Sequence, residues 1–352
     1  MIDFKALKID SLLVSSPANV RYLTGYTGSN GLALLLPDSL TLFTDPRYTL
    51  QARAEVAAAR LPAKVVISKK QLWKSALDTM KRKRLRRIGF EKSRLSYEVY
   101  DSLKEGLALA KGLEPVGGVI EELRMVKTAE EIELIRRSVE TNSKAFAAVV
   151  RQVKPGMTEA HVAAGLDYRM RRLGAQGTAF ETIVASGLRT AFPHARPTVR
   201  KLGPDELLLI DMGCSQDGYM SDMTRMLFVG KPSSKIRAMY AAVLEAQLAA
   251  IAAVRDGVST RKVDAAAREV LKRAGLEEAF VHSTGHGLGL EIHEAPRIGK
   301  KEPKRLQAGM TITIEPGAYV EGVGGIRIED TVLVTKTGCE VLTPTPKELM
   351  VL

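Results

Sequence analysis

Two apolar strand segments that each end in a carboxylate constrain the fold of this chain most strongly. In LLLIDMGCSQDGYMSDMTRMLFV, two strand-like runs flank the turn-like stretch SQDG. A hairpin centred between Gln216 and Asp217 places Asp211 directly opposite Asp222, with the Cβ atoms about 5 Å apart. Two like charges in an otherwise apolar segment repel each other, so this pair predicts a cation between them.

The same construction recurs in TITIEPGAYVEGVGGIRIED. Gly322 is the natural centre of a turn, and Glu315 and Glu329 lie equidistant from it, at the ends of the runs TITIE and GIRIE. A bulge at Pro316 and Gly317 would change this register. A salt bridge or a helix cap explains one buried acid, but two opposed acid pairs in one sheet indicate a metal site.

Histidine is scarce in this chain, and its distribution supports the metal site. Only five histidines occur among 352 residues, and three of them, His282, His286 and His293, lie in VHSTGHGLGLEIHEAP. The interleaved glycines argue against a helical zinc site in this window. Four carboxylates and an imidazole have room for two divalent ions, which activate water for attack on a carbonyl. This ligand set favours Mn or Co, with Fe or Zn as alternatives.

Length and composition limit the class of protein. A chain of 352 residues predicts two domains, and a hydrophobic fraction of 45% excludes wholesale disorder. The uninterrupted apolar runs, such as the one near residues 32–37, are too short to span a membrane, and the N-terminus lacks a signal-like apolar core. Cys214 and Cys339 do not make a disulfide framework. We therefore expect a cytoplasmic protein without a membrane partner.

The net charge of +12 permits nucleic-acid binding without establishing it. Its densest source is KRKRLRR, residues 81–87. A phosphate-binding patch is one interpretation of this cluster. The other is a solvated stretch that leads into the short strand RIGFE, and it is favoured because no aromatic residues and no nucleic-acid motif accompany the cluster. We expect no nucleic-acid partner.

The pattern of secondary structure changes near residue 120. Before it, the strand-like runs SLLVSS, GLALLLP, LTLFTD, VVIS and RIGFE alternate with helical segments, which predicts an α/β domain over residues 1–122. After it, Thr128 and Glu131 form a capping box at the start of a helix. Further helices are expected over residues 158–174, 235–255 and 260–273. Strand segments between and after them predict an α+β domain with an antiparallel sheet over residues 123–352.

Five residues in their sequence contexts resemble the metal-binding signature of the pita-bread metallopeptidases, which include methionine aminopeptidase, aminopeptidase P and prolidase. They are Asp211 in IDMG, Asp222 in SDMTR, His286 in GHGLG, Glu315 in IEPG and Glu329 in RIED. The segments SPANVRYLTGYTGSNGLALLL and ELRMVKTAEEIELIRRS resemble the N-terminal domain of the prolidase, aminopeptidase P and creatinase branch and its junction. The resemblance implies a C-terminal pita-bread fold after a creatinase-like N-terminal α/β domain.

The resemblance also implies a division of roles among the metal ligands. Asp211 would bind one ion terminally, and Asp222 and Glu329 would bridge two ions. His286 and Glu315 would complete the ligands of the second ion. Glu315 would also accept a proton from the attacking water.

For the substrate, the resemblance implies contacts from three histidines. His293, in IHEAP, resembles the histidine that holds the scissile carbonyl or stabilises the tetrahedral intermediate. His194, in FPHARPT, resembles a substrate-pocket histidine from a separate loop. His282 resembles a further pocket histidine, with a structural role as its alternative.

Two arginines are also candidates for substrate binding. Arg297, in HEAPRIG, matches an arginine that pairs with the C-terminal carboxylate of a dipeptide in prolidase-like members, a task that suits the fork of a guanidinium. Its alternative is a surface arginine in a loop. Arg327 lies two residues before Glu329 on the same strand face, where it either contacts substrate or supports the metal carboxylates.

The function implied is hydrolysis of Xaa-Pro bonds by a dinuclear metallopeptidase. A dipeptidase is favoured, and an aminopeptidase P that acts on longer peptides is the alternative. A non-enzymatic pita-bread protein that binds peptide, histone or nucleic acid, and a metal-free creatinase-like hydrolase, are disfavoured because all five metal-ligand positions are retained here. The resemblance further implies a homodimer.

Overall fold

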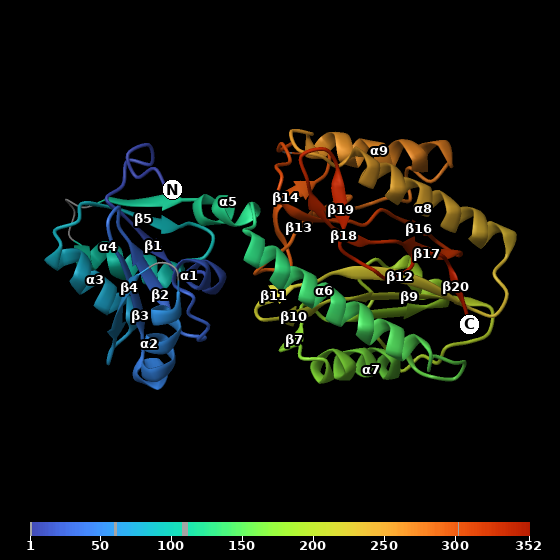
Figure 1. Cartoon of the computed structure of the whole chain (residues 1–352), viewed down its shortest axis with the longest axis horizontal. Helices are drawn as coiled ribbons and strands as arrows, with labels where there is room; N and C mark the ends of the chain where they lie inside the picture. The colour runs from blue at the N-terminus through green and yellow to red at the C-terminus, as the bar shows by residue number, and fades with distance from the viewer. Residues whose placement is uncertain (1, 60–61, 108–111, 302) are drawn as a thin grey trace. The chain divides into compact units, whose positions relative to one another are not determined.

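The computed structural model of the chain describes residues 2–59, 62–107, 112–301 and 303–352. The chain divides into two compact units, Met1–Arg124 and Met125–Leu352. Figure 1 colours the first unit from blue to green and the second from green to red. The sequence predicts this boundary between residues 122 and 123.

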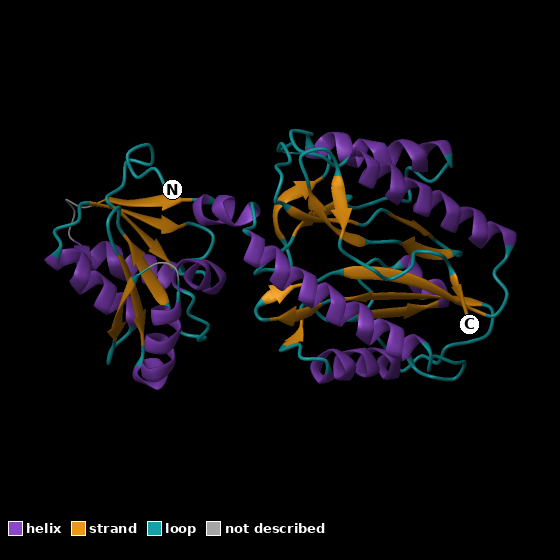
Figure 2. Ribbon diagram, in the orientation of Figure 1, coloured by secondary structure: helices purple, strands orange, loops and turns teal. Residues whose placement is uncertain are grey.

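A six-stranded sheet with the order β4-β3-β2-β1-β5-β6 forms the centre of the first unit (Figure 2). The pairs β1–β2 and β2–β3 are antiparallel, and the pairs β3–β4, β1–β5 and β5–β6 are parallel. The strands are β1 (Ser11–Val14), β2 (Leu32–Leu35), β3 (Leu40–Thr44), β4 (Ala63–Ile67), β5 (Arg87–Glu91) and β6 (Gly112–Val116). The helices are α1 (Pro17–Thr24), α2 (Thr49–Ala58), α3 (Leu72–Arg82), α4 (Tyr97–Leu107) and α5 (Val119–Met125). The predicted α/β domain is confirmed.

Alternating side chains of β1 enter two different apolar cores. Leu12 and Val14 pack in one core with Val20 of α1, and Leu13 packs in the other with Met80 of α3. Successive side chains of a strand point to opposite faces, so apolar side chains cover both faces of the sheet. This is why SLLV is a continuous apolar run rather than an alternating one.

The basic segment 81–87 links α3 to β5. Lys81 and Arg82 lie in the last turn of α3, where positive charge is favourable beside the helix C-terminus. The chain turns at Arg84, with φ of 56°, and buries Leu85. The basic side chains of the segment are exposed, as expected of a solvated stretch.

Four long helices enclose the strands of the second unit (Figure 1). They are α6 (Ala129–Val150), α7 (Glu159–Arg172), α8 (Ser234–Ala253) and α9 (Thr260–Arg273). The capping box of α6 is confirmed, because the Glu131 amide donates to Oγ1 of Thr128 and the Thr128 amide donates to the Glu131 carboxylate.

The strands of the second unit form four sheets, with orders β11-β10-β7, β20-β12-β9-β8, β14-β13-β15-β18-β19 and β16-β17. Within the described residues these pairings are antiparallel except for β12–β20. The strands up to residue 229 are β7 (Gly177–Thr178), β8 (Ile183–Ser186), β9 (Glu206–Met212), β10 (Cys214–Gln216), β11 (Tyr219–Met220) and β12 (Met223–Val229). The later strands are β13 (Gly285–Gly287), β14 (Glu294–Ile298), β15 (Thr311–Ile314), β16 (Gly317–Val320), β17 (Gly324–Arg327), β18 (Asp330–Val334), β19 (Cys339–Val341) and β20 (Met350–Val351).

Strand β9 separates two apolar cores in this unit. Leu207 and Leu209 pack in the core that contains α8 and α9, and Leu208 and Ile210 pack in the core that contains α6 and α7. Figure 1 shows the strands between these two helix pairs. Because side chains alternate along a strand, Asp211 falls on the same face as Leu207 and Leu209, at the end of the strand.

Helix α8 is long and apolar enough, by length and composition, to cross a membrane. This is weak evidence, because a buried helix of a protein core passes the same test. One side of α8 packs into the core of the second unit. Its buried residues are Ile236, Met239, Tyr240, Val243, Ala246, Gln247 and Ala250.

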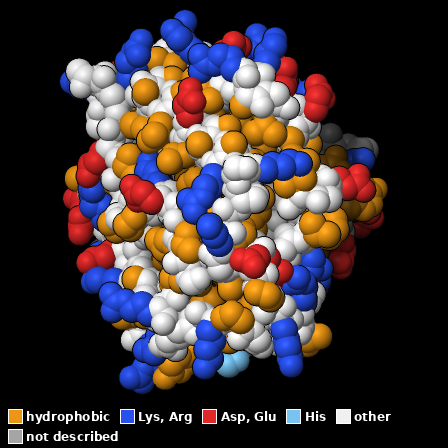
Figure 3. All heavy atoms as spheres, turned by 90° about the vertical axis from the view of Figure 1, so that its right-hand side faces the viewer, with side chains coloured by type: hydrophobic (Ala, Val, Ile, Leu, Met, Phe, Trp, Pro, Cys, Tyr) orange, Lys and Arg blue, Asp and Glu red, His pale blue; other side chains and the backbone are white. Residues whose placement is uncertain are grey.

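Charge is mixed on the face of the molecule that lies at the right of Figure 1. There, Lys and Arg side chains are interspersed with acidic and hydrophobic ones (Figure 3). The net charge of +12 therefore does not form a continuous basic surface on this face. The absence of a nucleic-acid partner stays a prediction.

Candidate active site

The hairpin of β9 to β12 brings Asp211 and Asp222 to one face, but not directly opposite each other. Asp211 pairs with Thr224, so the predicted pairing of the two aspartates is wrong by two residues. The turn consists of Asp217 and Gly218, with φ of 50° and 80°, between the paired residues Gln216 and Tyr219. Two successive residues with positive φ are typical of a type I′ turn, which Asp-Gly favours. A shift of two residues keeps both aspartates on the same face.

The second hairpin has the predicted register. Ala318 pairs with Ile326 and, beyond the interruption at Pro316, Ile314 pairs with Asp330, so both pairs are centred on Gly322. The predicted alternative, a register change at Pro316 and Gly317, does not occur. Glu315 and Glu329 therefore lie opposite each other in the gap between the two ladders.

The backbone of these two glutamates joins neighbouring strands instead of its own hairpin. The amide of Glu315 donates to the carbonyl of Thr284 at 2.8 Å, and the amide of Glu329 donates to the carbonyl of Thr224 at 3.2 Å. The first bond leads to the strand of His286, and the second leads to the strand that follows Asp222. These two bonds bring the two hairpins and the histidine strand to one point.

His286 presents one ring nitrogen to the carboxylates. Its Nδ1 lies 3.0 Å from the carbonyl oxygen of Gly287, so Nδ1 carries the proton and Nε2 has a free lone pair. Nε2 lies 3.6 Å from Oδ2 of Asp222 and 3.4 Å from Oε1 of Glu315. A second group that fixes the tautomer in this way is typical of a metal-binding histidine.

A glycine before His286 makes this arrangement possible. A Cβ atom on Gly285 would lie 1.9 Å from the carbonyl oxygen of Thr313 in β15. Only glycine allows the two strands to approach so closely. Gly285 therefore lets β13 lie close against β15.

The carboxylates and the imidazole fit a divalent metal. One ligand atom from each of Asp222, His286 and Glu329 lies within 4.8 Å of the others. Metal–ligand bonds are about 2.0–2.2 Å long, so two atoms that bind the same ion lie at most about twice that distance apart. The three ligand atoms therefore need to move only slightly closer together to bind one ion. Oδ1 of Asp211 is buried without a hydrogen-bond partner among the described residues. A buried anionic oxygen of this kind is costly unless a cation binds it.

The electrostatics of the cluster also indicate a bound cation. Burial, followed by repulsion from neighbouring carboxylates, raises the pKa of Asp222 and of Glu329 well above their usual values. Burial also raises the pKa of Glu315, to about 7. Acids so placed hold protons at neutral pH unless a cation takes the place of those protons.

Arg327 connects the two hairpins beneath the carboxylates. It donates to Oδ2 of Asp211 at 2.6 Å and to Oγ1 of Thr224 at 3.1 Å. Thr224 in turn donates to Oε2 of Glu329 at 2.7 Å. Of the two predicted roles, these contacts favour support of the metal carboxylates, although Arg327 also lines the cavity described below.

Tyr319 is a site residue that the sequence did not reveal. Its hydroxyl accepts from Arg327 at 2.6 Å and lies 2.9 Å from Nε2 of His282. Burial raises the pKa of Tyr319 to about 12, and burial together with the charge of Arg327 lowers the pKa of His282 to about 4. The Tyr319 hydroxyl therefore stays protonated and donates a hydrogen bond to Nε2 of the neutral His282. Tyr319 lies four residues after Glu315, and side chains an even number of residues apart along a strand point to the same face. This spacing is the one sequence signal that would have placed Tyr319 at the site.

The remaining predicted residues lie at the opening of the site. The ring of His293 is exposed and lies 4.5 Å from the ring of His286, between centroids. Arg297 is the register partner of His286 and is exposed. His194 is exposed on the segment after β8. The structure thus brings together residues from strands β9, β13, β14 and β17 and from the loops beside them.

All ten of the predicted site residues line one cavity of about 800 Å³. They are His194, Asp211, Asp222, His282, His286, His293, Arg297, Glu315, Arg327 and Glu329. Sequence reasoning missed other lining residues, among them Phe180, Glu181, Arg196 and Glu294. Glu294 also forms a buried ion pair with Lys127, at 3.2 Å.

Comparison with known proteins agrees with this geometry. Residues 133–336 match the model of metallopeptidase family M24, and residues 3–126 match the creatinase/prolidase N-terminal domain. The Xaa-Pro dipeptidase of Pyrococcus furiosus is 38% identical over 343 residues, which span 97% of this chain and 95% of that protein.

Solved structures are similar over the same extent. The Xaa-Pro dipeptidase from Bacillus anthracis has a TM-score of 0.95 and 36% identity, covering 99% of this chain and 97% of that chain. The X-Pro aminopeptidase from Thermotoga maritima has a TM-score of 0.91 and 35% identity, covering 99% of both chains. The predicted pita-bread fold after a creatinase-like domain is confirmed. With a family model that spans more than half of its length, the chain belongs to metallopeptidase family M24.

Proposed function

We propose that this metallopeptidase is an Xaa-Pro dipeptidase that uses two divalent ions, Mn or Co. The observation that carries the two-metal part is the convergence of Asp211, Asp222, Glu315, Glu329 and His286 on one cavity. One buried oxygen of Asp211 also has no hydrogen-bond partner among the residues that the structure describes. The named Xaa-Pro dipeptidases among its relatives support the substrate class.

The metal roles are those that the family resemblance implies. Asp211 would hold one ion, Asp222 and Glu329 would bridge both, and His286 with Glu315 would complete the second. Divalent ions bound there supply a Lewis acid for the substrate carbonyl and an activated water. Glu315 would also accept a proton from that water, the role that the family resemblance implies.

The residues at the opening would bind the substrate. A peptide bond before proline is a tertiary amide without an N–H group, so recognition must use the carbonyl and the two ends of the peptide. His293 and His194 would contact the carbonyl side of the substrate. The exposed guanidinium of Arg297, beside His286 in register, would hold the free carboxylate of a dipeptide in bidentate fashion.

Hydrolysis of Ala-Pro and of Ala-Pro-Ala by chelator-treated enzyme, with Mn²⁺ or Co²⁺ added back, tests the proposal. We expect metal to restore cleavage of Ala-Pro. No activity on either peptide contradicts the enzymatic function under these conditions, and cleavage of Ala-Pro-Ala alone identifies an aminopeptidase P.

The variant R297M tests how the dipeptide is recognised. We expect KM for Ala-Pro to rise at least about tenfold, since one charge-assisted pair contributes about 1.5–3 kcal/mol. KM for Ala-Pro amide, which lacks the carboxylate, is the control and should not change. An equal rise for both substrates contradicts the assigned role of Arg297.

The homodimer and the cytoplasmic location are further proposals that rest on the family resemblance and on composition. Sedimentation equilibrium of the purified protein tests the first, because a monomer mass near 38.3 kDa at micromolar concentration contradicts a dimer. Fractionation of the source cells tests the second.

A further inference from the structure

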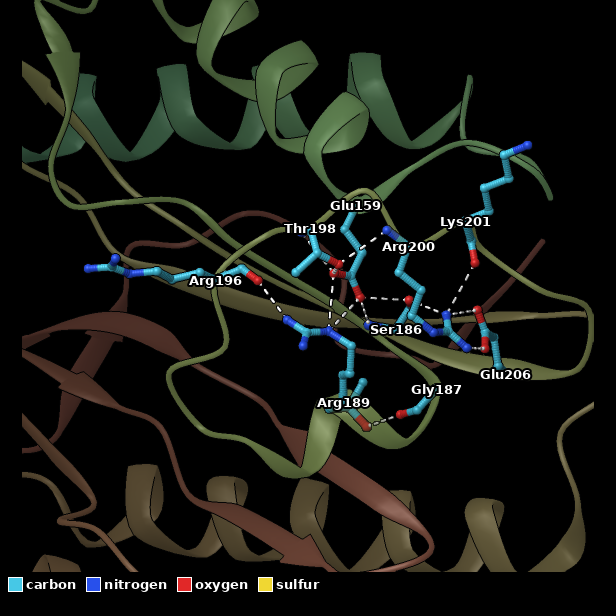
Figure 4. A network of polar contacts seen from close by, with 10 residues as sticks. Glu159, Ser186, Gly187, Arg189, Arg196, Thr198, Arg200, Lys201 and Glu206 are labelled. Carbon is cyan, nitrogen blue, oxygen red and sulfur yellow. Dashed lines mark hydrogen bonds and ion pairs between the residues drawn. The ribbon is translucent and has the colours of Figure 1, made fainter.

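Glu159 is a buried carboxylate that the metal centre does not use. It is the first residue of α7, and its side chain is fully buried. One oxygen accepts hydrogen bonds from the amide and the hydroxyl of Ser186, at 2.9 and 2.8 Å. The other accepts from the amide and the hydroxyl of Thr198, at 3.0 and 2.7 Å. Figure 4 shows these contacts converging on one side chain.

The two partners bracket a segment of the cavity wall. Ser186 and Thr198 lie on either side of residues 187–197, which we call the His194 loop. The loop contains the short helix η2 (Gly187–Ala191) and the lining residues 193–196. Glu159 therefore closes both ends of the loop through a single carboxylate.

Arg189 extends this contact to the cavity wall. Its Nε lies 3.3 Å from both oxygens of Glu159, and its Nη2 donates to the carbonyl oxygen of Arg196 at 2.7 Å. A guanidinium suits this bridge because its donors point in fixed directions. One cation thus joins the buried anion to the backbone of Arg196 (Figure 4), which lies two residues after His194 in the sequence.

His194 itself depends on the loop for its position. Its exposed side chain makes no hydrogen bond or ion pair within the part of the chain that the structure describes. The neighbouring carbonyl of Pro193 accepts a hydrogen bond from Arg327 at 3.1 Å. The backbone on both sides of His194 is therefore fixed while the imidazole is free to meet a ligand.

Glu159 is held in its ionised form. Burial raises its pKa, but the hydrogen bonds from Thr198 and Ser186 outweigh this and leave the pKa below its usual value. The start of α7 also favours a negative charge. A buried anion with this many donors fixes the geometry of its partners, because leaving any of them unpaired is costly.

We propose that Glu159 is a positioning residue that fixes the His194 loop and, through Arg189, sets how tightly substrate binds at His194. The proposal rests on the role of His194 as a substrate contact in the proposed function. Glu159 does not line the cavity, so its effect on the substrate is indirect.

The variant R189M tests the proposal. It removes the link from Glu159 to the loop but leaves Glu159 in place with its hydrogen bonds from Ser186 and Thr198. We expect KM for Ala-Pro to rise about tenfold or more, because small displacements of a binding group are costly. The bound Mn²⁺ and kcat should change less than about twofold, since the metal ligands are untouched. E159Q should show the same pattern. R136M is the matched control, because Arg136 loses two 2.6 Å bonds to Glu340 in the same unit, outside the cavity lining.

A double-mutant cycle with H194A separates positioning from general loss of structure. We expect H194A to raise KM, and R189M to add less than about twofold in the H194A background. The positioning role is overturned if the effects of R189M and H194A on KM multiply in full in the double variant. It is also overturned if R189M loses bound metal. An unchanged KM in R189M beside a raised KM in H194A overturns it too. An unchanged KM in H194A instead overturns the role of His194 in the proposed function.

Discussion

Replacing Arg327 with methionine tests whether the acid cluster depends on a cation. The guanidinium contacts Asp211, Tyr319, Thr224 and the carbonyl of Pro193 at 2.6–3.1 Å, and the residue is 3% exposed. Removing one partner of a buried ion pair costs about 3–5 kcal/mol, because the other charge remains buried. At roughly 2–4 °C per kcal/mol for a unit of this size, Tm of the metal-free protein should fall by roughly 6–20 °C.

Differential scanning calorimetry of R327M, with and without saturating Mn²⁺, measures this loss. A bound cation offers the unpaired carboxylate of Asp211 a new partner, so we expect Mn²⁺ to raise Tm more in R327M than in the unmodified protein. R136M is the control, since its exposed ion pair contributes at most about 1 kcal/mol. A fall in Tm no larger than that of R136M, or one that Mn²⁺ does not reduce, refutes the reasoning.

Three further predictions concern the same site. D222N should lower the bound metal by at least one ion per chain and remove most turnover; normal metal content and kcat contradict the bridging role of Asp222. With chelator present, the free energy of unfolding measured in urea should fall as pH rises from about 4.5 to about 7. Over this range Glu315, with its pKa raised to about 7, holds a proton in the folded protein that the unfolded chain releases. The contribution of Glu315 is about 3 kcal/mol, fully present below pH 4.5 and lost above pH 7, and Mn²⁺ should abolish this slope. G285A should destabilise the protein by more than about 1 kcal/mol through its clash with β15, whereas G338A, whose Cβ meets open space, should stay within about 0.5 kcal/mol; equal effects contradict the close approach.

The two hairpins show what local sequence determines. The register around Gly322 was predictable because apolar runs of equal length flank one flexible residue. The register of the other hairpin was missed by two residues, although the sequence carries the signal. Asp217-Gly218 is the dipeptide that a type I′ turn favours, and centring the turn there yields the observed pairing.

Long-range contacts account for the residues that were missed. Glu159 is bonded to Ser186 and Thr198, 27 and 39 residues away, and no periodicity encodes such distances. Tyr319 carries no charge, so a search for opposed acids passes over it. By contrast, the candidate ligand positions could be proposed from the sequence because buried charge in an apolar strand is rare enough to stand out.

The charge balance of the cluster argues for two ions rather than one. The cluster consists of Asp211, Asp222, Glu315 and Glu329. Among the described residues, Arg327 is the one permanent cation that forms an ion pair with any of them, and its partner is Asp211. Four carboxylates against one guanidinium leave three negative charges, and His286 is neutral because burial lowers its pKa. One divalent ion would still leave a buried negative charge, which repels an anionic nucleophile. A second ion makes the site positive by one charge, which favours hydroxide and an anionic intermediate. Metal analysis should therefore find two ions per active chain, and full activity with one contradicts this account.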